Sequence, residues 1–210
     1  MILPLHEWLL ANPAAAGPVD RRLRLYAVAC CRQRWELFDS DLFRRAVEVA
    51  EELAEGRADE KERAVLYAAI MDFPTPNGQS HCIENMTLKL LQNRGINCVA
   101  AAVSDLAFAT GAGDFEAVVQ AQAPLLRCVV GNPFRPVAFD PALRTPSTSE
   151  LATSIYADRA FDRMPAQADA LEKAGCGLPD LLAHCRGGGP HVRGCWVIDL
   201  LLGQAGPRAV

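Results

Sequence analysis

The stretch that decides the fold is DSDLFRRAVEVAEELAEG, residues 39–56. Its apolar residues recur every three to four positions, as they do on one face of an amphipathic helix: Phe43, Ala46, Val47, Ala50, Leu53 and Ala54. Asp39 and Ser40 stand where the N-cap of a helix belongs, and Gly56 stands where a helix ends in left-handed backbone. The stretch therefore predicts one well-delimited helix.

The same helical period continues on both sides of this stretch. Helices are predicted over residues 1–17, 20–38, 59–71, 83–93, 96–109, 114–130, 147–159, 165–175, 179–186 and 191–202, with a loop over 73–80. Asp20 is the expected N-cap of the second helix, and no segment alternates apolar and polar residues as a half-buried strand does. The predicted fold is all-α, with antiparallel helix pairs in a compact bundle; a solenoid-like stack of degenerate pairs is the alternative.

The longest irregular stretch, residues 131–149, divides the chain of 210 residues. It contains Pro133, Pro136, Pro141 and Pro146, which interrupt helical structure. We predict an N-terminal helical region over 1–130, an ordered connector over 131–149 and a C-terminal helical region over 150–210, packed as one unit with the first. Phe134, Val137 and Phe139 are expected to anchor the connector on the core.

Composition and charge exclude several classes of protein. Half of the residues are hydrophobic and 22% are charged, with 21 basic and 25 acidic residues, so the chain has no basic excess for a large phosphate-binding face. No run of 18 apolar residues exists, which argues against a membrane partner. The eight cysteines follow no secretory signal, and we expect reduced thiols in a cytoplasmic protein.

Several segments carry a resemblance to a known group of proteins. They are LRLYAVACCR at 23–32, RRAVEVAE at 44–51, GNPFRPV at 131–137, AFDRMP at 160–165 and HVRGCWVIDLLLG at 191–203. With these segments the chain resembles a large uncharacterised family that is multiplied in planctomycete genomes. The resemblance covers most of the chain outside residues 58–122 and implies no known activity.

A cysteine and histidine cluster near the C-terminus is the densest group of metal-ligating residue types. His184, Cys185, His191 and Cys195 are the candidate ligands of a closed zinc site. If the helix begins near residue 191, His191 and Cys195 share one of its faces, and His184 and Cys185 reach them across the turn of Gly187 to Pro190. The alternative without a metal is a packed helical corner in which the buried cysteines are unreactive. No other cofactor is indicated.

The same region contains two further candidate sites. Arg193, His191 and Arg135 are candidate anion-binding residues, because a glycine-rich turn precedes a helix there; an interhelical turn whose arginine pairs with an acid is the alternative. Cys185 or Cys195 with a histidine and Asp199 supplies the parts of a thiol hydrolase, although spacing does not establish geometry.

The arginines of residues 21–34 are a candidate nucleic-acid-binding face, which the acidic residues of 48–55 would neutralise. With no clear active site in the sequence, the preferred interpretation is a non-catalytic module that binds another protein. A zinc-binding or thiol hydrolase using the His184 to Cys195 region is one alternative. A nucleic-acid-binding helical protein is the other, and the charge balance disfavours it.

Overall fold

The computed structural model is all-α over the residues it describes, which are 16–74, 78–92, 95–109, 111, 115–132, 135 and 137–204. No strand occurs among them. None of their helices combines the length and apolar character that a membrane crossing needs. The chain divides into two compact units, Met1–Ala123 and Pro124–Val210.

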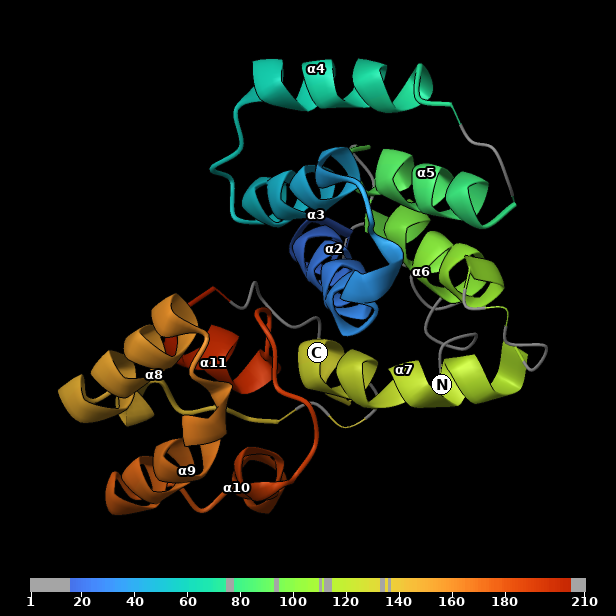
Figure 1. The fold of residues 1–210 in the computed structure, drawn as a ribbon. Coiled ribbons are helices and arrows are strands. Elements are labelled where there is room, and N and C mark those ends of the chain that lie inside the picture. The colour runs from blue at the N-terminus through green and yellow to red at the C-terminus, as the bar shows by residue number, and fades with distance from the viewer. Residues whose placement is uncertain are drawn as a thin grey trace. The chain divides into compact units, whose positions relative to one another are not determined.

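The N-terminal unit is a bundle of helices (Figure 1). They are α2 (Ala16–Gln33), the short 3-10 helix η2 (Trp35–Leu37), α3 (Asp41–Ala54), α4 (Glu60–Met71), α5 (Gly78–Leu90), α6 (Gly95–Ala109) and the first part of α7 (Phe115–Val130). α2 packs against α3 and α6, α5 packs against α6 and α3, and α4 lies outermost on α3 and α5. Tyr26, Phe38 and Phe43 are among the largest side chains in its core.

Helix α3 begins and ends where the sequence of residues 39–56 predicts. The Ser40 side chain accepts a hydrogen bond from the backbone N–H of Leu42, and Gly56 has a φ of 67°. Phe43, Ala46, Val47 and Ala50 of α3 are buried. The local signals here agree with the tertiary packing, and the prediction of this helix is confirmed.

Asp20 is not an N-cap, because α2 already begins at Ala16. Its side chain instead accepts a hydrogen bond from the backbone N–H of Gly95, at the start of α6. The Asp20 backbone also lies so close to Gly95 that a Cβ there would collide with it. The Asp20 side chain thus accepts a hydrogen bond from the first residue of a helix far along the chain, a contact that no local pattern predicts.

The C-terminal unit surrounds one short buried helix. It contains the end of α7, η3 (Pro141–Leu143), α8 (Pro146–Asp158), η4 (Phe161–Arg163), α9 (Met164–Lys173), α10 (Pro179–Arg186) and α11 (Trp196–Leu201). α9 packs against α8 and α10, and α11 packs against α8 and α10. Every residue of α11 is buried.

The connector belongs to the core of this unit. Leu143 is buried, and Val137 and Phe139 pack against the same apolar cluster. Phe134 and residues 1–15 lie outside the described residues. The predicted anchoring by Phe134 and the predicted helix at the N-terminus therefore stay predictions. The division between the units falls inside α7, before the connector.

Three further predicted boundaries are wrong. α8 begins at Pro146 with Thr145 as its N-cap, because proline suits the first helical position. α5 begins at Gly78, so the loop over 73–80 is shorter than predicted. The last helix begins at Trp196 rather than at residue 191, since Gly194 adopts a φ of 84° that breaks the helix.

Candidate metal centre

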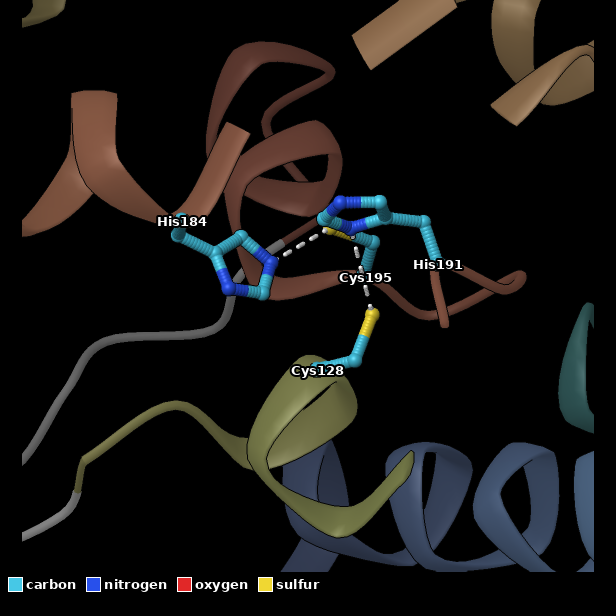
Figure 2. Close-up of side chains that lie close together, drawn as sticks. All are labelled: Cys128, His184, His191 and Cys195. Carbon is cyan, nitrogen blue, oxygen red and sulfur yellow. Dashed lines mark hydrogen bonds between the residues drawn. The ribbon is translucent and has the colours of Figure 1, made fainter. Parts of the chain in front are cut away.

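Four side chains of the C-terminal unit bring their donor atoms together (Figure 2). They are Cys128, His184, His191 and Cys195, and their ligand atoms all lie within 4.8 Å of one another. Among the described residues this is the one group of three or more histidine, cysteine or acidic side chains so arranged. These four residues are the candidate ligands of one metal ion, and we refer to them as the metal centre.

The elements that carry the four residues meet at the buried helix α11. Cys128 lies in the last turn of α7, and His184 lies in the last turn of α10. His191 and Cys195 lie in the turn between α10 and α11, where the backbone N–H of Cys195 donates to the carbonyl of Val192 over 2.9 Å. This compact turn, rather than a helix face, brings His191 and Cys195 together.

Gly131 and Trp196 pack the end of α7 against the start of α11. Gly131 has a φ of 72°, and a Cβ built on it would lie 3.3 Å from the Trp196 ring. The Trp196 ring also lies 5.3 Å from the ring of His184, between centroids. A glycine is needed here because both the backbone angle and the close approach disfavour a side chain. The contact places Cys128 next to the turn.

Two distances within the metal centre lie in the range of a tetrahedral site, and all the donor atoms lie within 4.8 Å of one another. Nε2 of His184 lies 3.3 Å from Sγ of Cys195, and Nδ1 of His191 lies 3.8 Å from Sγ of Cys128. Bond lengths of about 2.0 Å to nitrogen and about 2.3 Å to sulfur make the edges of a tetrahedral zinc site about 3.3 to 3.8 Å long. The four donors therefore need only small movements to bind one ion.

The two cysteines of the centre differ in the direction of their pKa shifts. Burial raises the pKa of Cys195, but hydrogen bonds from Cys128, His184 and His191 outweigh burial and hold the pKa well below its ordinary value. The pKa of Cys128 is raised well above its ordinary value, first by its hydrogen bond to Cys195 and then by burial. One thiolate is thus already favoured, and a cation would favour the second.

The ring of His191 is oriented by the sulfur atoms. Its Nδ1 faces Cys128, whereas its Nε2 is buried and has no hydrogen-bond partner among the described residues. A buried polar atom without a partner costs free energy. Nδ1, which faces the sulfur atom of Cys128, is the ring nitrogen placed to coordinate a metal ion.

Sequence reasoning identified three of these four residues. Cys185, the fourth predicted ligand, is not in the group; it is fully buried in the apolar core with Cys176 and Leu181. Neighbouring residues on a helix point about 100° apart, so His184 and Cys185 of α10 face different surroundings. Cys128 stands in place of Cys185, and no spacing signal links it to residues 184–195.

The structure places the three candidate anion-binding residues in different surroundings within the C-terminal unit. His191 belongs to the metal centre. Arg193 stacks over the ring of Tyr156, 5.3 Å from its centroid, and its Nη2 donates to the carbonyl of Ala157 near the end of α8. Arg135 lies exposed in the connector. Arg193 thus contacts the C-terminal end of α8.

The arginines of α2 are largely occupied within the N-terminal unit. Arg21 pairs with Glu55 over 3.0 Å and Arg32 pairs with Glu51 over 2.7 Å, so the acidic side of α3 compensates them. Arg22 and Arg24 are buried. These arginines do not present a continuous exposed basic face.

Comparison with protein-family models, with curated proteins and with solved structures found no match. The geometry of the metal centre is therefore the basis for inferring a function.

Proposed function

We propose that the C-terminal unit binds one zinc ion through Cys128, His184, His191 and Cys195, and that the ion has a structural role in a non-catalytic helical module. The observation that carries this proposal is the convergence of two sulfur and two nitrogen donors within 4.8 Å from three separate parts of the chain. A donor set of two thiolates and two imidazoles in tetrahedral arrangement is typical of structural zinc.

A structural role is favoured over a catalytic one because the protein supplies all four ligands. Catalytic zinc sites keep one position for water or substrate. Cys128 and Cys195 are both buried, and the histidines are partly buried. The ion would instead join the end of α7, the end of α10 and the turn before α11 into one cross-link.

The burial of the candidate nucleophiles weakens the thiol hydrolase alternative, because a substrate cannot reach them. Cys195 has the lowered pKa that a nucleophile needs, but its side chain is fully buried. Burial raises the pKa of Cys185 above the ordinary range, which makes it a poor nucleophile. We therefore favour zinc coordination by Cys195 over nucleophilic catalysis.

The wider role that we propose is binding of another protein in the cytoplasm. All eight cysteines lie among the described residues and none is in a disulfide, as suits a reducing compartment. The pairing of the α2 arginines makes nucleic acid the weaker choice of partner. We also propose membership of the planctomycete-expanded family; its segment at 191–203 carries two of the four ligands.

The test is the metal content of the full chain purified without chelator, by native mass spectrometry and elemental analysis. We expect one zinc per chain, and a His191→Ala variant with less than about a tenth of an equivalent. Cobalt substitution should give the visible spectrum of a tetrahedral site with two thiolates.

Cys185→Ala is the matched control, because Cys185 is the buried neighbour of a ligand and not a ligand itself. This variant should keep a full equivalent of zinc. A wild-type chain that stays metal-free when refolded with excess zinc would refute the proposal. Equal zinc loss in both variants would show that the assignment of ligands is wrong.

A further inference from the structure

The outermost helix of the N-terminal unit, α4, is apolar on both of its faces. Its inner face buries Leu66 and Ile70. Its outer face exposes Ala64, Val65, Ala68, Ala69 and Met71, and Val65 and Met71 are 68% and 56% exposed. A helix on the surface of a bundle normally presents polar residues to water. The outer face of α4 therefore has the composition of an interface.

Two charges lie at opposite ends of this outer face. Lys61 lies in the first turn of α4, and Asp72 is the C-cap residue; both are exposed. Within the described residues neither side chain makes an ion pair, whereas Glu62 pairs with Arg45 and Glu60 pairs with Arg63. Positive charge near a helix N-terminus and negative charge at its C-terminus oppose the helix dipole, so the two positions do not serve α4 itself.

The outer face is complementary to itself when two copies run antiparallel. A two-fold axis between residues 66 and 67 places Lys61 opposite Asp72 of the other copy, and Val65 opposite Ala68. It also places Ala64 opposite Ala69. The alanines allow the helix axes to approach closely, and each Lys61 to Asp72 pair occurs twice, as an isologous interface requires.

We propose that the outer face of α4 is a self-association surface, on which a second copy of this chain packs its own α4 in antiparallel orientation. This inference goes beyond the zinc centre, since it concerns the N-terminal unit and needs no metal. A single helix pair buries less surface than the roughly 1,200 Å² of stable complexes, so the dimer is weak. It forms at about 100 µM chain and dissociates near about 1 µM.

Sedimentation of the full chain across this concentration range tests the proposal. Val65→Glu should leave a monomer at every concentration, because it places a charge in the middle of the apolar face. Phe108→Glu is the matched control: Phe108 is 73% exposed on α6, away from this face, and its replacement should leave the dimer unchanged. A monomeric wild type, or equal effects of the two variants, would overturn the proposal.

Charge exchange tests the antiparallel register. Lys61→Asp and Asp72→Lys should each weaken the dimer about tenfold, because each change puts like charges opposite one another twice. The double variant should restore the wild-type affinity. Both single changes suit the dipole of α4, so the variants should fold. Failure of the double variant to restore association would reject this register and with it the proposed surface.

Discussion

Two groups of buried cysteines, one in each unit, show how differently the same side chain behaves. The N-terminal group is Cys30, Cys31 and Cys98, and the other consists of Cys128 and Cys195 of the metal centre. All five are almost completely buried. Burial raises the pKa of Cys30 to about 12 and that of Cys98 to about 11. In the metal centre, the pKa of Cys195 is lowered instead.

The difference comes from what surrounds the sulfur atoms, since burial is equal. Cys98 donates a hydrogen bond to the carbonyl of Lys89 over 3.3 Å, and such a bond suits the neutral thiol. Cys195 receives hydrogen bonds from two histidines and a second thiol, and these stabilise a thiolate. A buried cysteine is thus an apolar core residue in one unit and a candidate ligand in the other.

Removal of the metal should have the largest effect that distinguishes the two groups of cysteines, because only one group binds the ion. With a strong chelator we expect the melting temperature of the C-terminal unit to fall by at least about 10 °C, because binding of zinc to the folded state stabilises it by several kcal/mol. The N-terminal unit should keep its melting temperature. Calorimetry, with hydrogen exchange to assign each transition to a unit, measures this.

A Cys98→Ala variant is the control for the chelation experiment, because it removes a buried thiol without touching the metal centre. Its response to chelator should equal that of the wild type. The comparison would fail if chelator left the C-terminal unit unchanged, or lowered both transitions together.

Alkaline pH should act on the N-terminal group. The folded-state pKa of Cys98 is raised from 9.0 to about 11, so its contribution to stability is fully present below pH 9 and is lost as the pH rises through 11. We expect the free energy of unfolding of the N-terminal unit to fall by about 2 to 3 kcal/mol over this window from Cys98 alone. Denaturant titrations between pH 7 and 11 measure it.

In the Cys98→Ala variant the fall should be smaller by the same amount, since the titrating thiol is gone. An identical pH profile in the variant and the wild type would mean that Cys98 is already solvated, against its complete burial in the structure.

The smallest expected effect concerns the polar support of the N-terminal group. The Tyr26 hydroxyl donates to Oε1 of Gln122 over 3.1 Å, and Nε2 of Gln122 donates to the carbonyl of Ala102 over 2.8 Å. Tyr26→Phe leaves Oε1 of Gln122 without this donor, at a cost of about 1 to 2 kcal/mol. Chemical denaturation should show this loss with unchanged zinc content. A change in zinc content would contradict the independence of the two groups.

The helices and several of their ends could be predicted from the sequence because their signals are local. Ser40 and Gly56 delimit α3 as expected, since capping depends on neighbouring backbone groups. The prediction of Asp20 as an N-cap of its own helix is wrong, because its side chain accepts a hydrogen bond from Gly95, a residue distant in the chain. The predicted start of the last helix at residue 191 is wrong because Gly194 has a positive φ, which interrupts a helix. The apolar pattern around Gly194 does not indicate this backbone angle.

The candidate site follows the same division. His184, His191 and Cys195 lie within twelve residues, so the sequence by itself determined that three metal-ligating side chains are close together. It also determined the all-α class, since helical periodicity is a property of neighbouring residues. Only the tertiary structure decided that Cys128 joins them and Cys185 does not. That choice depends on the packing of the end of α7 against the turn before α11, and such contacts arise from the folded core instead of from spacing along the chain.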